Sequence, residues 1–293
     1  MRSFLIGMAF CCVTLLLTAC ENQISDANDV ANGEALQEVS FKVLDFEQTL
    51  KQMGVIEADT RASLSGNATY LKVALFSGGS KKYEFAQTSE DDGFGVISAL
   101  VLPDDYAMVV IASKVEMTID DATDIYPTGG KLNDTFYIYR TLTKDELKEG
   151  SVAVALHRAV ALLEFKTDAK PSEVTSFTLE ISGVSTKLNA VTGLSAESTT
   201  LACTFDQTGR TAVDCGMYMF LPSDDANVTV KATAYDEQGG VVKTNTFTGV
   251  QMKTAYHTCC SGNFFQVNAS WSITIYNADW PEKIDVPYDL SSL

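Results

Sequence analysis

Short segments rich in β-branched and aromatic residues recur along the whole chain, and this pattern constrains the fold more than any other feature. Clear examples span 70–76, 107–111, 136–139, 177–181, 228–232 and 271–275. Glycine-containing turn signals separate these segments, because glycine's permissive backbone lets a chain reverse; they lie at 77–80, 90–93, 127–130 and 238–240. The pattern predicts an all-β protein.

One segment interrupts this pattern. Residues 142–149 are expected to form a short helix, because Thr143 and Glu146 stand at the spacing of a capping box. Gly150 would end the helix. A helical turn at this point suits a boundary between two domains.

Two pairs of short segments repeat at the same interval. Residues 43–46 resemble residues 162–165, and residues 102–105 resemble residues 221–224. Such a repeat predicts that one β-sandwich topology is used twice. Together with the helical turn, it predicts an N-terminal sandwich over 41–150 and a C-terminal sandwich over 151–293.

The N-terminus has the features of an export signal. Arg2 precedes an apolar stretch over 4–17, which fits a secretory signal better than a membrane span. The stretch ends in Leu17-Thr18-Ala19-Cys20, which resembles the lipobox of bacterial lipoproteins. Residues 1–19 are therefore predicted to be a signal peptide, and Cys20 the lipidated residue that anchors the chain to the outer membrane. The alternative is an ordinary signal peptide with a structural Cys20.

Residues 20–40 are polar and acidic and are expected to form a flexible tether. An acidic tether behind the lipid resembles the surface-export signal of Bacteroidetes lipoproteins, which implies exposure at the cell surface. The net charge of the chain is −17, and no cluster of Lys and Arg offsets it. Nucleic acid is therefore disfavoured as a partner.

The cysteines agree with an exported protein. Apart from Cys20, the mature chain holds Cys203, Cys215, Cys259 and Cys260. One or two disulfides are expected in an oxidising compartment, and Cys203 with Cys215 is the candidate pair if their strands are neighbours. The sequence alone does not fix the pairing. No zinc spacing occurs and the chain has two histidines, so no metal or cofactor is expected.

Several longer stretches resemble one protein family. They are residues 156–165, residues 134–137, residues 218–222 and the lipobox. The chain is similar in these stretches to the fimbrillin superfamily of Bacteroidales, most of all to the lipid-anchored anchor or accessory subunits of protease-assembled (type V) pili. The resemblance implies two transthyretin-like β-sandwich domains in tandem, other fimbrial subunits as partners, and a role in adhesion to host or bacterial surface ligands.

Subunits of that family assemble by strand donation, and two segments bear on this mechanism. Arg61 and Ala62 resemble the site at which an Arg-specific protease removes the first strand of stalk subunits; the alternative is an ordinary surface arginine. The tail over 284–293 is the candidate donor strand, although pairing within its own domain is an equal alternative. Its apolar residues face one side: Ile284, Val286, Tyr288 and Leu290.

The segment at 41–46 resembles a first strand that cleavage after Arg61 would discard. We therefore expect a membrane-anchored base or accessory subunit, with a stalk or tip subunit cleaved after Arg61 as the alternative. A glycan-binding surface lipoprotein is a further alternative, with Trp280 as its candidate aromatic, since Trp271 fits a core strand. No catalytic motif is present, and His157 and His257 are isolated, so an enzyme is not expected.

Overall fold

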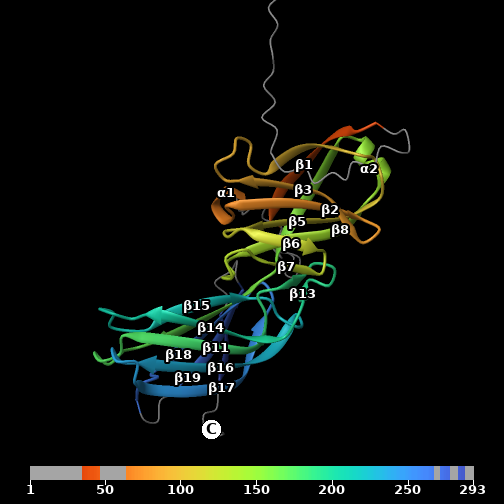
Figure 1. The fold of residues 1–293 in the computed structure, drawn as a ribbon. Helices are drawn as coiled ribbons and strands as arrows, with labels where there is room; N and C mark the ends of the chain where they lie inside the picture. The colour runs from red at the N-terminus through yellow and green to blue at the C-terminus, as the bar shows by residue number, and fades with distance from the viewer. Residues whose placement is uncertain (1–34, 47–63, 267–270, 278–282, 288–293) are drawn as a thin grey trace, which may run out of the picture.

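The computed structural model describes residues 35–46, 64–266, 271–277 and 283–287 (Figure 1). The chain is built almost entirely of β-strands. The first half contains β1 (Gln37–Phe46), α1 (Leu64–Asn67), β2 (Tyr70–Ser77), β3 (Ser80–Thr88), β4 (Val96–Val101), β5 (Tyr106–Ser113), β6 (Met117–Asp121), β7 (Asp124–Pro127), β8 (Thr135–Leu142), α2 (Lys144–Lys148) and β9 (Ser151–Arg158).

The second half contains β10 (Ala161–Thr167), β11 (Ser176–Val184), β12 (Leu188–Asn189), β13 (Leu194–Ser195), β14 (Thr199–Asp206), β15 (Asp214–Met219), β16 (Asp225–Tyr235), β17 (Val241–Lys253), β18 (Tyr256–Gly262), β19 (Trp271–Asn277) and β20 (Lys283–Pro287). The all-β prediction is confirmed. Within the described ranges, neither helix has the length and apolar composition needed to cross a bilayer.

The first sandwich is one seven-stranded sheet with the order β3-β2-β5-β8-β9-β1-β4. The pairing between β8 and β9 is limited to Phe136 with Arg158 and Tyr137 with His157. The sheet therefore folds over at this point, and a single apolar core contains inward side chains from both of its halves. Val39 and Phe41 of β1 are 0% and 3% exposed in this core.

The second sandwich packs the sheet β14-β11-β16-β17 on the sheet β15-β10-β18-β19-β20. Aromatic rings fill its centre: Phe165 lies 5.2 Å from Phe177 and 5.0 Å from Trp271 between ring centroids. Such tilted contacts add to the stability gained by burying apolar area. The prediction that Trp271 belongs to the core is confirmed, with 7% of its surface exposed.

The two sandwiches share one strand connectivity. β1 pairs antiparallel with β4 and parallel with β9, and β10 pairs antiparallel with β15 and parallel with β18. The opposite sheets run β3-β2-β5-β8 and β14-β11-β16-β17, in matching chain order. The repeated segments 102–105 and 221–224 each connect equivalent strands, β4 to β5 and β15 to β16. The repeat seen in the sequence therefore reflects a repeated topology, to which β19 and β20 are added at the C-terminus.

The boundary expected at residue 150 is wrong by one strand. β9 pairs in parallel with β1 from Ser40 with Ser151 to Phe46 with Leu156, so it completes the first sandwich. The second sandwich begins only with β10. The helix before this point is as expected: Thr143 accepts from the backbone N–H of Glu146, whose side chain accepts from the backbone N–H of Thr143.

A third apolar cluster lies where the two sandwiches meet. A small sheet with the order β13-β12-β7-β6 draws strands from both halves of the chain. Behind it, Ile111, Tyr137 and Ile125 of the first half pack with Leu188 and Phe220 of the second. The outer face of β2-β5-β8 is consequently covered, which explains why β5 is buried almost throughout.

Candidate functional site

Several residues singled out from the sequence lie outside the described residues. They are Cys20, Arg61, Ala62, Trp280, Tyr288 and Leu290, together with the leader and the tether as far as residue 34. Their expected roles stay predictions. Ile284 and Val286 lie on β20, which pairs antiparallel with β19.

In this structure β20 is thus paired within its own domain and forms the outermost strand of the five-stranded sheet. Pro287, opposite Ser272, ends this strand. Proline has no N–H to donate and is tolerated on a strand at the edge of a sheet. Among the described strands β20 is hydrogen-bonded only to β19, so its second edge has no strand paired to it there.

The four cysteines of the second sandwich are free thiols. Cys203 lies on β14 and Cys215 on β15, and these strands belong to opposite sheets. Among the described residues these two strands therefore share no ladder, and a disulfide between Cys203 and Cys215 stays a prediction. Burial raises the pKa of Cys215 and of Cys260 to about 12.

The five-stranded sheet of the second sandwich carries one group of polar side chains that resembles a catalytic set. Glu164 contacts Nε2 of His257 at 3.1 Å and Nζ of Lys166 at 2.8 Å, and Cys259 lies opposite Glu164 in the strand register. Burial and the charge of Glu164 raise the pKa of Cys259 to about 11. Because the thiolate is the reactive form, this group is poorly suited to nucleophilic chemistry. No cluster in the described part of the chain could hold a metal ion.

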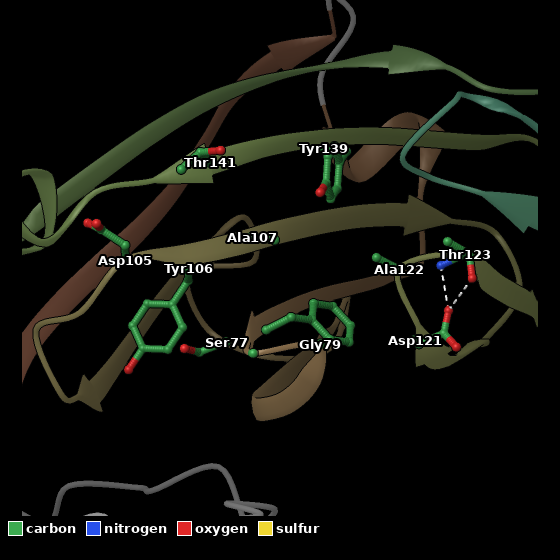
Figure 2. A pocket seen from close by; sticks show the side chains of 12 residues that line it. Ser77, Gly79, Asp105, Tyr106, Ala107, Asp121, Ala122, Thr123, Tyr139 and Thr141 are labelled. Carbon is green, nitrogen blue, oxygen red and sulfur yellow. Dashed lines mark hydrogen bonds between the residues drawn. The ribbon is translucent and has the colours of Figure 1, made fainter.

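An open depression of about 590 Å³ lies on the first sandwich (Figure 2). Four segments build it: the turn from β2 to β3, the start of β5, the turn from β6 to β7, and β8. Its lining residues are Phe76, Ser77, Gly78, Gly79, Asp105, Tyr106, Ala107, Asp121, Ala122, Thr123, Tyr139 and Thr141.

The strand register explains why the sheet is hollow at this place. Phe76, Ala107 and Thr141 form one row across β2, β5 and β8, because Ala107 pairs with both neighbours. The small side chain of Ala107 between two larger ones leaves a gap. Tyr139 lies two residues before Thr141 on β8 and pairs with Val109. Its partly exposed ring forms a side wall of the depression.

Two carboxylates stand at opposite ends of the depression, Asp105 beside Thr141 and Asp121 beside Thr123 (Figure 2). Oδ1 of Asp105 accepts from the backbone N–H of Lys144 at 2.8 Å. Oδ1 of Asp121 accepts from the hydroxyl and the backbone N–H of Thr123, both at 2.6 Å. These hydrogen bonds lower the pKa of Asp121, so it is charged at neutral pH.

Asp105 directly precedes β5, and Asp121 ends β6 and accepts hydrogen bonds within its own turn. Their meeting at one depression was missed. No local signal could have revealed it, since it depends on the pairing of β2, β5 and β8.

Comparison with known proteins gives a family and a fold. The model of a family of unknown function, DUF6562, matches residues 107–287. No curated protein sequence matches the chain. Among solved structures, an adhesin candidate from Bacteroides ovatus has a TM-score of 0.52 at 13% identity, covering 80% of this chain and 88% of its own. This similarity agrees with the all-β sandwich fold.

Two further solved structures are similar at lower scores. A fimbrial assembly protein from Parabacteroides distasonis has a TM-score of 0.45 at 14% identity, covering 87% of this chain and 100% of its own. The fimbrial anchor protein Mfa2 from Porphyromonas gingivalis has a TM-score of 0.47 at 8% identity, covering 83% and 98%.

Proposed function

The chain belongs to the family of unknown function DUF6562, and we propose that it is a structural subunit of a cell-surface fimbrium with an adhesion-type role. One observation carries this proposal: two β-sandwiches of one topology follow each other, and their fold is similar to that of the Bacteroides ovatus adhesin candidate over most of both chains. The predicted export signal, and the lipobox-like sequence that ends at Cys20, support a location at the outer membrane.

Within a fimbrium, the role we favour is the lipid-anchored base or an accessory subunit. β1 lies between β4 and β9, and Phe41 is buried in the core. Processing after Arg61 would remove this strand and open an apolar groove between its two neighbours. A subunit that keeps its lipid on Cys20 also keeps β1. A stalk or tip subunit, cleaved after Arg61, is the alternative.

Contact with other subunits is proposed at β20. This strand is held on one side only, by the ladder with β19. A strand that is paired on one side only can be replaced by a strand from a neighbouring subunit. Alternatively, the neighbour's strand can add to its open edge through main-chain hydrogen bonds. The role is structural rather than enzymatic, in keeping with the raised pKa of Cys259 beside His257 and Glu164.

Deletion of the gene, followed by electron microscopy of the cell surface, tests the proposal. Loss of fibres, or longer fibres shed into the medium, is the expected result. Unchanged fibres would overturn the fimbrial role. Mass spectrometry of the mature N-terminus separates the two roles, because an anchor begins at a lipid-modified Cys20. Assembled chains that begin at Ala62 would identify a stalk or tip subunit instead.

A further inference from the structure

We propose that the depression between β2, β5, β8 and the turn from β6 to β7 binds a neutral saccharide. This site lies on the first sandwich, apart from β20, and the inference does not depend on the fimbrial role. Its volume of about 590 Å³ falls within the range of small-molecule sites in proteins.

The walls require a ligand with an apolar face. The side chain of Phe76 stands beside the short Ala107, the ring of Tyr139 stands in the next row on β8, and Ala122 closes the depression from the turn between β6 and β7. All four belong to, or pack against, the apolar cluster behind the sheet. A pyranose ring presents C–H groups on one face, which suits such a wall.

The rim requires a ligand that donates hydrogen bonds. Asp105 and Asp121 lie at opposite ends, and each is fixed by hydrogen bonds to the protein backbone. Hydroxyl groups donating to ionised carboxylates form short, strong hydrogen bonds. Thr123, Thr141 and Ser77 add hydroxyls that can donate or accept. A saccharide carries hydroxyls around an apolar ring and so matches both walls and rim.

The charge of the depression excludes acidic ligands. No Lys, Arg or His stands among its lining residues, while two carboxylates do. An anionic sugar, a sulfate or a phosphate would meet two negative charges without a compensating cation. A linear polyamine would satisfy the carboxylates but has no ring face for Tyr139. A neutral sugar therefore fits the lining better than either charged class.

Saturation-transfer NMR on the full-length chain in detergent tests the proposal. The probes are maltose, cellobiose and lactose as neutral disaccharides, with glucuronic acid and putrescine as the anionic and cationic comparisons. A printed array of neutral oligosaccharides extends the panel. We expect transfer to at least one neutral sugar and none to glucuronic acid. Absence of any neutral sugar signal, or a signal from putrescine alone, would overturn the proposal.

Variants locate the binding. Ala107→Leu fills the gap in the row and is expected to weaken binding by about tenfold or more. Asp105→Asn is expected to weaken it less, because an amide oxygen still accepts. The matched controls are Ala202→Leu, on an exposed face of β14, and Glu90→Gln, on an exposed turn. Sugar binding that survives Ala107→Leu would contradict the assignment.

If Ala107→Leu fails to fold, Thr141→Trp replaces it. Thr141 is exposed at the rim, so a larger side chain there covers the depression without entering the core. Retained binding in a folded Thr141→Trp variant would equally overturn the proposal.

Discussion

Arg158 and Asp134 form a two-point ion pair at the fold of the seven-stranded sheet. Nε of Arg158 donates to Oδ1 of Asp134 at 2.8 Å, and Nη2 donates to Oδ2 at 3.1 Å. The side chains are only 14% and 10% exposed, and the guanidinium carbon lies 4.8 Å from the ring centroid of Phe136. The pair thus connects the start of β8 to the end of β9, where backbone pairing is limited to two residue pairs.

Removing one partner of this pair should destabilise the protein strongly. Asp134→Asn leaves a nearly buried guanidinium without its counter-charge, and we expect a loss of about 3 kcal/mol in the free energy of unfolding. Urea denaturation measures this loss. Lys231→Met, which removes an exposed pair with Glu180, is the control and should cost less than about 1 kcal/mol. Equal losses in the two variants would show that burial of the Arg158 pair has no special effect.

Gly193 supplies a second test of the junction between the sandwiches. Its φ is +75°, and a Cβ added there would collide with the hydroxyl oxygen of Tyr137. Gly193→Ala should therefore cost more than the ~1–3 kcal/mol of an alanine held at positive φ. Gly209→Ala is the matched control, because Gly209 has a φ of +73° and open space around its Cβ position. The difference between their unfolding free energies measures the contact, and no difference would mean that Tyr137 moves away freely.

The capping box of α2 predicts a pH dependence. Hydrogen bonds from the backbone of Thr143 and from Arg140 lower the pKa of Glu146 below its ordinary value of 4.5. A lowered folded-state pKa means that the charged form contributes stability above the ordinary pKa. This contribution is lost as the pH falls through the lowered value. Glu146→Gln should therefore flatten the dependence of unfolding free energy on pH over this acidic range.

Thr143→Ala tests the other half of the box. It removes the side-chain acceptor for the N–H of Glu146 and should cost about 1 kcal/mol at neutral pH. Chemical denaturation between pH 3 and pH 7, compared across wild type and both variants, checks the two expectations. If the unfolding free energy of Glu146→Gln depends on pH as strongly as that of the wild type, other carboxylates control stability in this acidic range.

Local features of the sequence were sufficient to predict some parts of this structure but not others. The capping box at Thr143 and the core position of Trp271 depend on nearby residues, and both are present. The place of β9 depends on parallel pairing with β1, a strand far away in the sequence, so the helical turn before β9 does not mark the domain boundary that local features predict.

Other features lay beyond any local pattern. The sheet that joins the sandwiches contains strands as short as Leu188–Asn189, too short to show a period of two. The depression depends on the register that sets Ala107 between Phe76 and Thr141. By contrast, the family-like stretches 134–137 and 156–165 proved to meet in space, through the pairing of Phe136 with Arg158.

The thiols of the second sandwich should differ widely in reactivity. The thiolate is the form that reacts, and burial raises the pKa of Cys215 and Cys260 to about 12 and that of Cys259 to about 11. Cys203 is only partly buried. In the folded protein, iodoacetamide should therefore label Cys203 well before the other three, as measured by peptide mass spectrometry over time. Urea should remove the difference, since all four thiols then meet solvent.

Cys203→Ser is the control for this experiment and should abolish the fast phase. Two results would contradict the expectation. Equal labelling rates in the folded chain would mean that burial does not protect the other cysteines. Protection of both Cys203 and Cys215 until a reductant is added would show that these two residues are joined across the sheets, and the disulfide considered from the sequence would then describe the exported protein.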